Sequence, residues 1–326
     1  MEAPLPLDVD ICDAHFHLYD TKDPDRSFPG TYSPAQLHAD AAGFRIAQGV
    51  FAECGQHYTK DASPEMRPVG ETKWVCTQDP NAKFITGIVG FADLSLGEAV
   101  SEVLAAHVEA ATGRRFCGVR HSTTWDPAPE MRLSHMSPPR GLLATKAFGE
   151  GCEALEKMGM TYDAFMFFHQ LEELVPFARA HPQLTIVLNH LGGFLGIGPY
   201  KGKRGEVLSE WRAKICKVAA CENVVMKVGG LGRPKAGFGW ESRTEKPNSM
   251  EVYEAWKDPV SLCFDLFGPD RCIFESNFPV DGQAISYTSF VNALIRMTAS
   301  LSRDERRAYF HDTAARVYRL PSRVAS

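Results

Sequence analysis

The sequence has no run of about 18 uninterrupted apolar residues, the length that a membrane-spanning helix requires. It also has no basic N-terminal segment followed by an apolar one, which is the pattern of a secretion signal. Its net charge of -5 gives no positive excess that would attract nucleic acid or an anionic membrane surface. These absences predict a cytoplasmic protein that binds a small molecule and neither membranes nor nucleic acid.

The nine cysteines form no CxxC pair, and their odd number and scattered spacing argue against a disulfide framework. Several lie within apolar runs, which predicts buried thiols in a reducing compartment. No glycine-rich phosphate-binding loop follows the first apolar run. No linker or low-complexity segment interrupts the chain, so residues 1–326 are predicted to form one domain.

Short apolar runs recur along the whole chain, and most are continuous rather than alternating, as in parallel strands that are covered on both faces. Eight such runs are found, at residues 11–18, 49–54, 84–91, 116–121, 160–167, 184–190, 223–228 and 271–277. Helical patterns separate the later ones, at residues 98–111, 146–158, 171–180, 207–220, 252–267 and 289–299. This alternation predicts the α/β class and a (β/α)8 TIM barrel, with a doubly wound open sheet as the alternative.

The tail and the loops add two expectations to the barrel. Residues 304–318 predict a further helix that packs over the outside of the barrel. The connections after the second, fourth, sixth and seventh strands are long, at 56–81, 123–142, 192–204 and 229–250. Loops that follow the strands of such a barrel meet at its C-terminal face, where catalytic residues of this fold gather. We therefore expect a pocket there for a substrate of more than a few atoms.

His15 and His17 stand at alternate positions of the first strand. Side chains two residues apart in a strand share a face, so the two imidazoles are expected to lie side by side, with Asp13 on the same face. His190 ends the sixth strand after an apolar run. The three histidines are the predicted metal ligands, because neutral imidazoles are common zinc ligands, and they could equally bind an anionic substrate group.

Other polar residues end the remaining strands at the same face, where buried charges must be paired, hydrated or bound to a metal. Arg120 and His121 alternate, so only one of them is expected to enter the pocket, and we predict His121. The role of His169 is left open between structural and catalytic, and that of Lys227 between binding a substrate carboxylate and pairing with an acid. The predicted substrate-binding residues are Glu53, Arg120, His121, Tyr162, His169 and Lys227, and the predicted catalytic residues are His190, Glu275, Asn277 and Asp281.

Three segments, at residues 13–18, 186–193 and 274–279, carry a resemblance to a known family. In this order they resemble the amidohydrolase superfamily, in particular the TIM-barrel metal-dependent hydrolases related to 2-pyrone-4,6-dicarboxylate lactonase. Residues 118–121 and 309–320 extend the resemblance over nearly the whole chain. It implies a (β/α)8 barrel, hydrolysis of an ester, lactone or amide, and in many members one divalent metal, here Zn or Mn.

One residue departs from the family pattern. At the eighth strand the family has an aspartate that acts as metal ligand and general base, and this chain has Asn277. An amide cannot take a proton from water, and it binds a cation less strongly than a carboxylate does. Glu275 on the same strand face, or Asp281 or Glu53 from nearby loops, could supply the charge. The lactonase branch works without a tightly bound metal, so metal-dependent and metal-free reactions are both open.

The combined prediction is a hydrolase that opens a lactone, another carboxylic ester or an amide of a small acidic or aromatic substrate. Water would attack a carbonyl that the histidines polarise, and Glu275 or Asp281 would take its proton. Arg120 or Lys227 would hold an acid group of the substrate. The alternatives are a metal-dependent decarboxylase of an aromatic or unsaturated acid, and a binding barrel that lost its base at Asn277. A homodimer is a further expectation.

Overall fold

Eight parallel strands form one closed ring in the computed structural model, which describes residues 2–23, 28–131 and 137–322. Each strand pairs with the next along the chain, and hydrogen bonds from His17 to Phe278 and from Asn277 to His15 join the last strand to the first. The strands are β1 Ile11–Phe16, β2 Ile46–Ala52, β3 Ile85–Gly90, β4 Arg115–Val119, β5 Thr161–Ala164, β6 Ile186–Leu188, β7 Val224–Gly229 and β8 Cys272–Glu275. The predicted TIM barrel is thereby confirmed.

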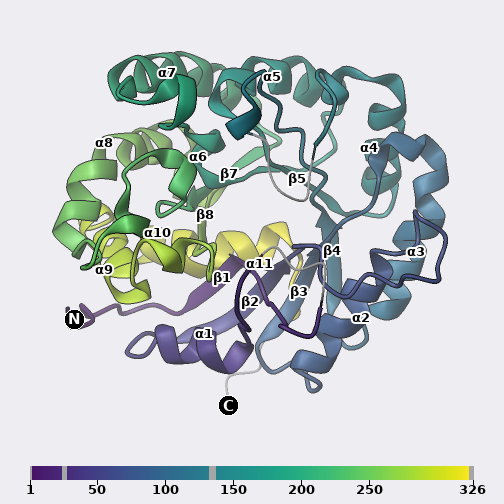
Figure 1. Ribbon diagram of the computed structural model, residues 1–326, viewed down its shortest axis with the longest axis horizontal. Helices are drawn as coiled ribbons and strands as arrows, with labels where there is room; N and C mark the ends of the chain where they lie inside the picture. The colour runs from purple at the N-terminus through teal and green to yellow at the C-terminus, as the bar shows by residue number, and fades with distance from the viewer. Residues whose placement is uncertain (1, 24–27, 132–136, 323–326) are drawn as a thin grey trace.

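Helices surround this ring, as Figure 1 shows. Their sequences supply their own start signals: Asn248 caps α8 and Glu251 bonds back to it, and Ser33 with Gln36 does the same for α1. The helices are α1 Pro34–Asp40, α2 Val69–Gln78, α3 Val100–Ala110, α4 Lys146–Lys157, α5 Leu171–Ala180, α6 His190–Gly193, α7 Arg204–Ala219, α8 Ser249–Phe267, α9 Tyr287–Met297, α10 Arg303–Arg307 and α11 Thr313–Val317. The six helical patterns predicted along the chain all correspond to helices of this set.

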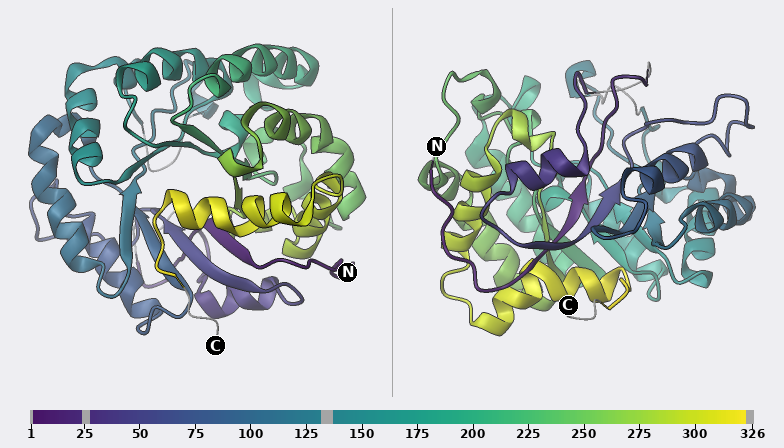
Figure 2. Two further views of the ribbon diagram at one scale, coloured as in Figure 1. Left: turned by 180° about the vertical axis from the view of Figure 1, so that it is seen from behind. Right: turned by 90° about the horizontal axis from the view of Figure 1, so that it is seen from below.

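The C-terminal tail does not lie where the sequence pattern placed it. The helical turns from α10 to α11 cross the N-terminal end of the barrel instead of joining the outer ring of helices, and the left view of Figure 2 shows them in yellow across the strands. Ala314 and Tyr318 pack among small interior residues that include Cys12, Ala14 and Val50. Because those side chains are too small to fill the barrel, the tail completes its core from below.

The structure also bears on the expectations for the cysteines and for membrane spans. All nine cysteines are free thiols, and seven of them are buried. Within the described parts of the chain, no helix combines the length and the apolar character that crossing a membrane would take.

Candidate active site

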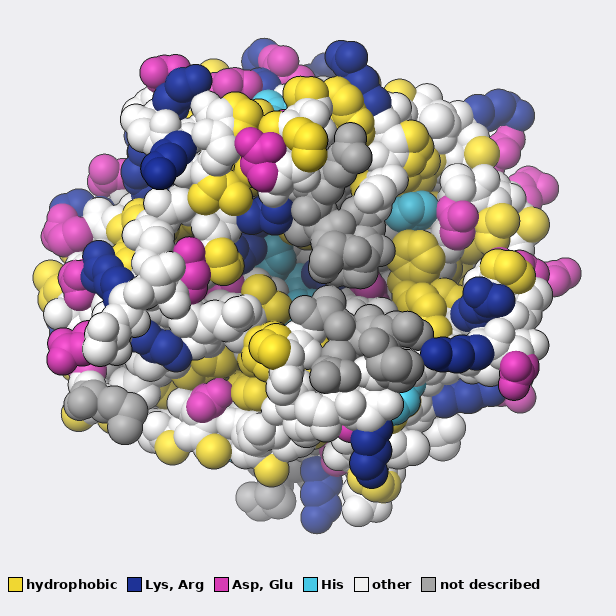
Figure 3. Space-filling model, in the orientation of Figure 1, with side chains coloured by type: hydrophobic (Ala, Val, Ile, Leu, Met, Phe, Trp, Pro, Cys, Tyr) yellow, Lys and Arg dark blue, Asp and Glu magenta, His cyan; other side chains and the backbone are white. Residues whose placement is uncertain are grey.

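His15 and His17 lie side by side at the C-terminal end of β1, as their spacing predicted. Their Nε2 atoms are 3.3 Å apart, and the two rings meet edge to face with centroids 4.9 Å apart. Nδ1 of His17 lies 2.9 Å from the carbonyl oxygen of Ala52 at the end of β2. Both side chains are buried. Figure 3 shows histidine side chains at the floor of a hollow near the centre of this face of the molecule.

Asp13 does not share their face, which corrects the expectation from simple alternation. Asp13 pairs with Gly49 and Phe16 pairs with Phe51. Between these two pairs β1 advances by three residues and β2 by only two, so β1 contains a bulge. Such a bulge reverses the facing of the residues before it. The Asp13 carboxylate instead accepts hydrogen bonds from the Ser276 backbone N–H at 3.0 Å and the Tyr287 hydroxyl at 3.2 Å. Asp13 therefore ties β1 to the end of β8 and to α9.

His190 follows β6 and lies against the histidine pair, with its ring centroid 4.7 Å from that of His15. Its backbone is left-handed, with φ of 55°, and left-handed residues follow it through Gly193. This turn directs both the backbone N–H and Nδ1 of His190 at one oxygen of Glu275, each at 2.8 Å. Among the described residues none forms a hydrogen bond with Nε2 of His190.

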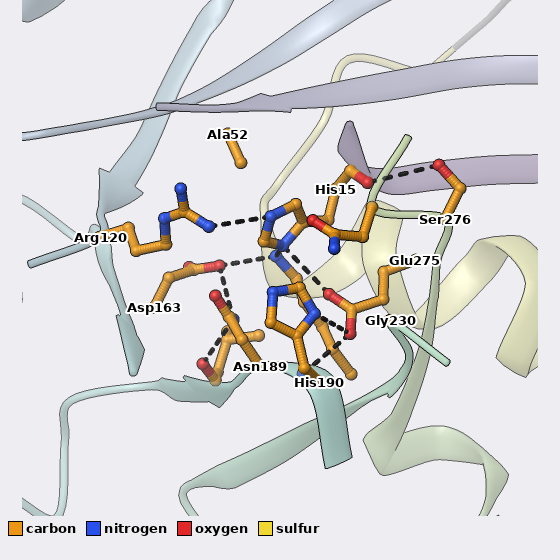
Figure 4. A network of polar contacts seen from close by, with 12 residues as sticks. His15, Ala52, Arg120, Asp163, Asn189, His190, Gly230, Glu275 and Ser276 are labelled. Carbon is orange, nitrogen blue, oxygen red and sulfur yellow. Dashed lines mark hydrogen bonds and ion pairs between the residues drawn. The ribbon is translucent and has the colours of Figure 1, made fainter. Parts of the chain in front are cut away.

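Glu275 lies between two of the imidazoles, as the close-up in Figure 4 shows. Its Oε1 bonds His190, and its Oε2 is 3.0 Å from Nδ1 of His15, although the approach is too oblique for a hydrogen bond and leaves that buried oxygen unsatisfied. Burial raises the pKa of Glu275 to about 7, against the opposing effect of the nearby Lys227 ammonium. A carboxylate with such a pKa can exchange a proton near neutral pH.

The hydrogen-bond partners define the state of all three imidazoles. The Ala52 carbonyl can only accept, so Nδ1 of His17 carries hydrogen, and the Glu275 carboxylate favours the same tautomer in His190. In His15 the Arg120 guanidinium, which can only donate, favours the lone pair on Nε2. Each Nε2 then presents a lone pair. Burial, with a further effect of neighbouring cationic side chains, lowers the pKa of each histidine well below its usual value. The cluster is therefore uncharged at neutral pH.

Arg120 enters the site from the end of β4. Its Nε donates to Oε1 of Glu53 at 2.7 Å, a second guanidinium nitrogen donates to the Glu53 carbonyl, and Nη1 lies 3.0 Å from Nε2 of His15. Arg120 and Glu53 are both buried, so each charge compensates the other. The guanidinium thus supplies a fixed positive charge directly beside the neutral imidazoles.

His121 points away from the site, contrary to the prediction that it rather than Arg120 would enter. Its Nδ1 accepts from the backbone N–H of Leu94 at 3.1 Å, and it lies 3.7 Å from the carboxylate of Asp93. The two residues do take opposite sides of the chain, as alternation requires. What local alternation could not decide is which of the two sides faces the barrel axis.

Lys227 and Asp163 form a buried ion pair beneath His15. Nζ of Lys227 is 2.7 Å from Oδ2 of Asp163 and 3.4 Å from Nδ1 of His15. The Asp163 carboxylate also accepts from the Tyr318 hydroxyl at 2.7 Å and from the Asn189 amide at 3.4 Å. Of the two roles left open for Lys227, the structure shows pairing with an acid.

Asn277 occupies the place beside His17 where the family pattern has a carboxylate. Its amide Nδ2 donates to Asp281 at 2.7 Å, which turns Oδ1 toward Nε2 of His17 at 3.1 Å. The other oxygen of Asp281 accepts from the Gly232 backbone N–H at 2.6 Å. Burial raises the pKa of Asp281 to about 7. Asp281 therefore orients Asn277 and does not itself contact the imidazoles.

Two predicted substrate-binding residues lie outside this cluster. Tyr162 is fully buried in the layer between barrel and helices, where its hydroxyl donates to the His121 carbonyl at 3.2 Å. His169 bonds Asp126 at 2.9 Å and stacks on Tyr200, which donates to the same carboxylate at 2.7 Å. Its described contacts join loops at the rim of the barrel, which favours the structural of its two possible roles.

Sequence reasoning missed two residues near the site as functional candidates, Tyr318 and Arg233. It placed Asp163 among the polar residues at the strand ends but assigned it no role. Arg233 lies in the long loop after β7 and is buried, and it bonds only the carbonyls of Gly230 and Phe194, at 3.3 and 3.4 Å. No carboxylate of the described residues lies within ion-pair distance of it, although Asp281 and Glu275 act on its charge from farther away. Its charge thus lacks the directly contacting acid that Arg120 and Lys227 have.

The donor set fits a divalent metal ion. Ligand atoms of His15, His190 and Glu275 lie within 4.8 Å of one another. The lone pairs of His15 Nε2 and of Asn277 Oδ1 both face Nε2 of His17, at 3.3 and 3.1 Å, and such lone pairs repel unless a cation lies between them. A metal on His15 Nε2 would replace the hydrogen bond from Arg120, so the two cations compete for one lone pair.

The site combines neutral imidazoles, a carboxylate of raised pKa and a fixed guanidinium. These groups lie at the C-terminal mouth of a (β/α)8 barrel and are those of a hydrolytic enzyme site. The amidohydrolase family model matches residues 12–320. The chain therefore belongs to the amidohydrolase family, and it is an enzyme of that superfamily.

The chain is also similar to three individual proteins. The uncharacterized protein y4mH of Sinorhizobium fredii is 30% identical over 330 residues, which cover 96% of this chain and 99% of the relative. The L-fucono-1,5-lactonase of Burkholderia multivorans is 27% identical over 87% of this chain and 83% of its own. A solved amidohydrolase structure from Burkholderia multivorans with bound zinc has a TM-score of 0.73 at 25% identity, covering 95% and 99% of the two chains.

Proposed function

We propose that the protein hydrolyses the lactone of a small acidic compound, with His190 and Glu275 as the base. The observation that carries this proposal is the hydrogen bond between Nδ1 of His190 and Glu275, which leaves a lone pair on Nε2. The similarity to an L-fucono-1,5-lactonase supports a lactone rather than an amide as the substrate class.

In this reaction His190 takes a proton from water at Nε2, and Glu275 stabilises the imidazolium through Nδ1. The water oxygen bonds the lactone carbonyl carbon, and the ring C–O bond then breaks. The proton passes from His190 to the leaving oxygen, so that the product is the open hydroxy acid and no other reactant is consumed.

Arg120 is the group suited to stabilise the negative oxygen that forms during the attack. The sequence suggested that the histidines polarise the carbonyl, but burial lowers their pKa values and keeps them neutral. The Arg120 guanidinium is always charged, and Glu53 fixes its position from behind. A fixed donor of this kind typically contributes about 10²–10³ in rate.

Arg233 is the residue suited to hold an acid group of the substrate. Arg120 and Lys227, the two candidates from the sequence, already have Glu53 and Asp163 as partners. A buried guanidinium without a carboxylate in direct contact is costly, so an anionic ligand at Arg233 gains a strong, charge-assisted hydrogen bond. This favours a lactone that carries a carboxylate over a neutral one.

A divalent metal held by His15, His17 and His190 is the alternative to this reaction, because a metal on Nε2 of His190 would occupy the lone pair that otherwise takes the proton. Bound there, it would polarise the carbonyl and lower the pKa of a bound water to about 7. The imidazole-rich donor set suits Zn, and Mn is the second candidate.

The test is turnover of matched pairs of five- and six-membered lactones with and without a carboxylate, followed by proton release and by NMR of the products. The assay is run on protein as purified, after chelation, and after addition of Zn or Mn. Ring opening of the acidic members supports the proposal. Release of CO2 from an aromatic acid would assign the decarboxylase alternative, and tight binding without turnover would assign the binding barrel.

A further inference from the structure

The tail residue Tyr318 reaches the floor of the active site from the opposite end of the barrel. It belongs to the turn that follows α11 and is 1% exposed. Its ring passes through the lower layer of small interior residues, among them Ala14, Cys117 and Val187. The tail thus closes the barrel with a side chain that ends in a polar group, although an apolar one would fill the same space.

Tyr318 contacts both members of the buried pair below His15. Its hydroxyl donates to Oδ2 of Asp163 at 2.7 Å, and Nζ of Lys227 lies 5.4 Å from the centroid of its ring. The hydrogen bond to the carboxylate and the cation–π contact with the ammonium both hold the two side chains in this one arrangement. Thr161 donates to the other oxygen of Asp163 at 3.1 Å, so the carboxylate is held from two sides.

The position of Lys227 matters because its ammonium lies at Nδ1 of His15, the nitrogen that also faces Glu275. The ammonium can only donate, so it competes with Glu275 for this side of the imidazole. Asp163 keeps the ammonium at 3.4 Å from that nitrogen. If Asp163 turned, Lys227 would be free to pair with Glu275, the carboxylate that orients His190.

From this geometry we propose that Tyr318 is a positioning residue for the reaction. It acts through Asp163 and Lys227 to keep Glu275 available to the histidines, and it does not touch the substrate. The kinetic part of this inference rests on the proposed hydrolase function, and the structural part does not.

The test compares Tyr318→Phe with Tyr309→Phe. Both tyrosines come from the tail and are fully buried, and each loses one hydroxyl hydrogen bond, but that of Tyr309 goes to the backbone carbonyl of Val228 at 2.8 Å. Tyr318→Phe should lower kcat about tenfold with little change in KM, because displaced catalytic groups slow the chemical step. Tyr309→Phe should keep the kcat of the parent, and both variants should show similar Tm values.

Crystal structures of the two variants provide a measurement that needs no substrate. In Tyr318→Phe the Lys227 ammonium should leave its position beside Asp163, whereas in Tyr309→Phe it should stay. Unchanged kcat and unchanged Lys227 in Tyr318→Phe would overturn the inference, and so would an equal loss of kcat in both variants. If the parent opens no lactone, the proposed function fails, and the position of Lys227 alone then decides the role of Tyr318.

Discussion

Nδ1 of His190 lies 2.8 Å from Oε1 of Glu275, and the backbone N–H of the same histidine bonds the same oxygen. Two hydrogen bonds from one residue fix both the tautomer and the orientation of its ring. The left-handed backbone at His190 makes this possible, because it turns the N–H and the side chain in one direction. The strain of that conformation is thus compensated at the position where a base is needed.

Replacement of His190 by asparagine should remove most of the turnover. Asparagine tolerates the left-handed backbone, so the fold should be retained, but it cannot accept a proton. We expect kcat to fall by about 10²–10⁴, the usual contribution of a general base. The control is His121→Asn, which keeps an acceptor for the Leu94 N–H outside the site and should retain activity. Full activity in His190→Asn would refute the assigned base.

The pH dependence of kcat/KM should show an ascending limb with an apparent pKa near 7. Burial raises the pKa of Glu275 to about 7, and the base acts only when this carboxylate is ionised, so the rate rises as the pH increases through that value. Asp281 has a similarly raised pKa of about 7. The limb should vanish in Glu275→Gln and persist in Asp281→Asn, and the reverse result would move the base to Asp281.

Asn277→Asp should strengthen metal binding. A carboxylate facing Nε2 of His17 would replace the neutral amide and attract a cation directly. We expect the affinity for Zn to increase at least about tenfold, in line with the sensitivity of metal sites to their ligand environment. Titration calorimetry with Zn alone and elemental analysis of the purified proteins measure this. Equal affinity in the parent and the variant would place the metal away from Asn277.

Arg233→Met should impair acidic substrates selectively. Loss of a hydrogen bond to a charged group should raise KM for a carboxylated lactone by about 10- to 100-fold, with little effect on its neutral counterpart. Arg204→Met is the matched control, because Arg204 also lacks an acidic partner among the described residues but stacks on Phe238 and Trp256 instead. An equal change for acidic and neutral lactones would show that Arg233 serves the fold and not specificity.

The barrel and the centre of the site could be predicted from local pattern. Continuous apolar runs mark strands that are covered on both faces, and eight of them between helices leave few arrangements. The ends of such strands meet at one mouth, which brings His15, His17, His190 and Glu275 together although they are far apart in the sequence. The departure from the family pattern at Asn277 could also be recognised from the sequence, because the position of this residue directly after β8 follows from the strand.

Local pattern failed wherever the outcome depended on contacts between distant segments. The bulge in β1 arises from its pairing with β2, and it turned Asp13 to the outer face. Arg120 rather than His121 faces the site because Arg120 has a buried partner there, Glu53, at the end of another strand. The alternation within β4 does not reveal a partner on a different strand.

The sequence by itself determined the order of strands and helices and the residue types at the mouth of the barrel, because these follow from spacing along the chain. Only the tertiary structure decided the charge pairing, and with it that no described acid contacts Arg233 directly and that Tyr318 reaches Asp163 from the far end of the barrel. Pairing of buried charges is a property of the assembled core, where the cost of leaving a charge alone selects among partners that sequence distance cannot reveal.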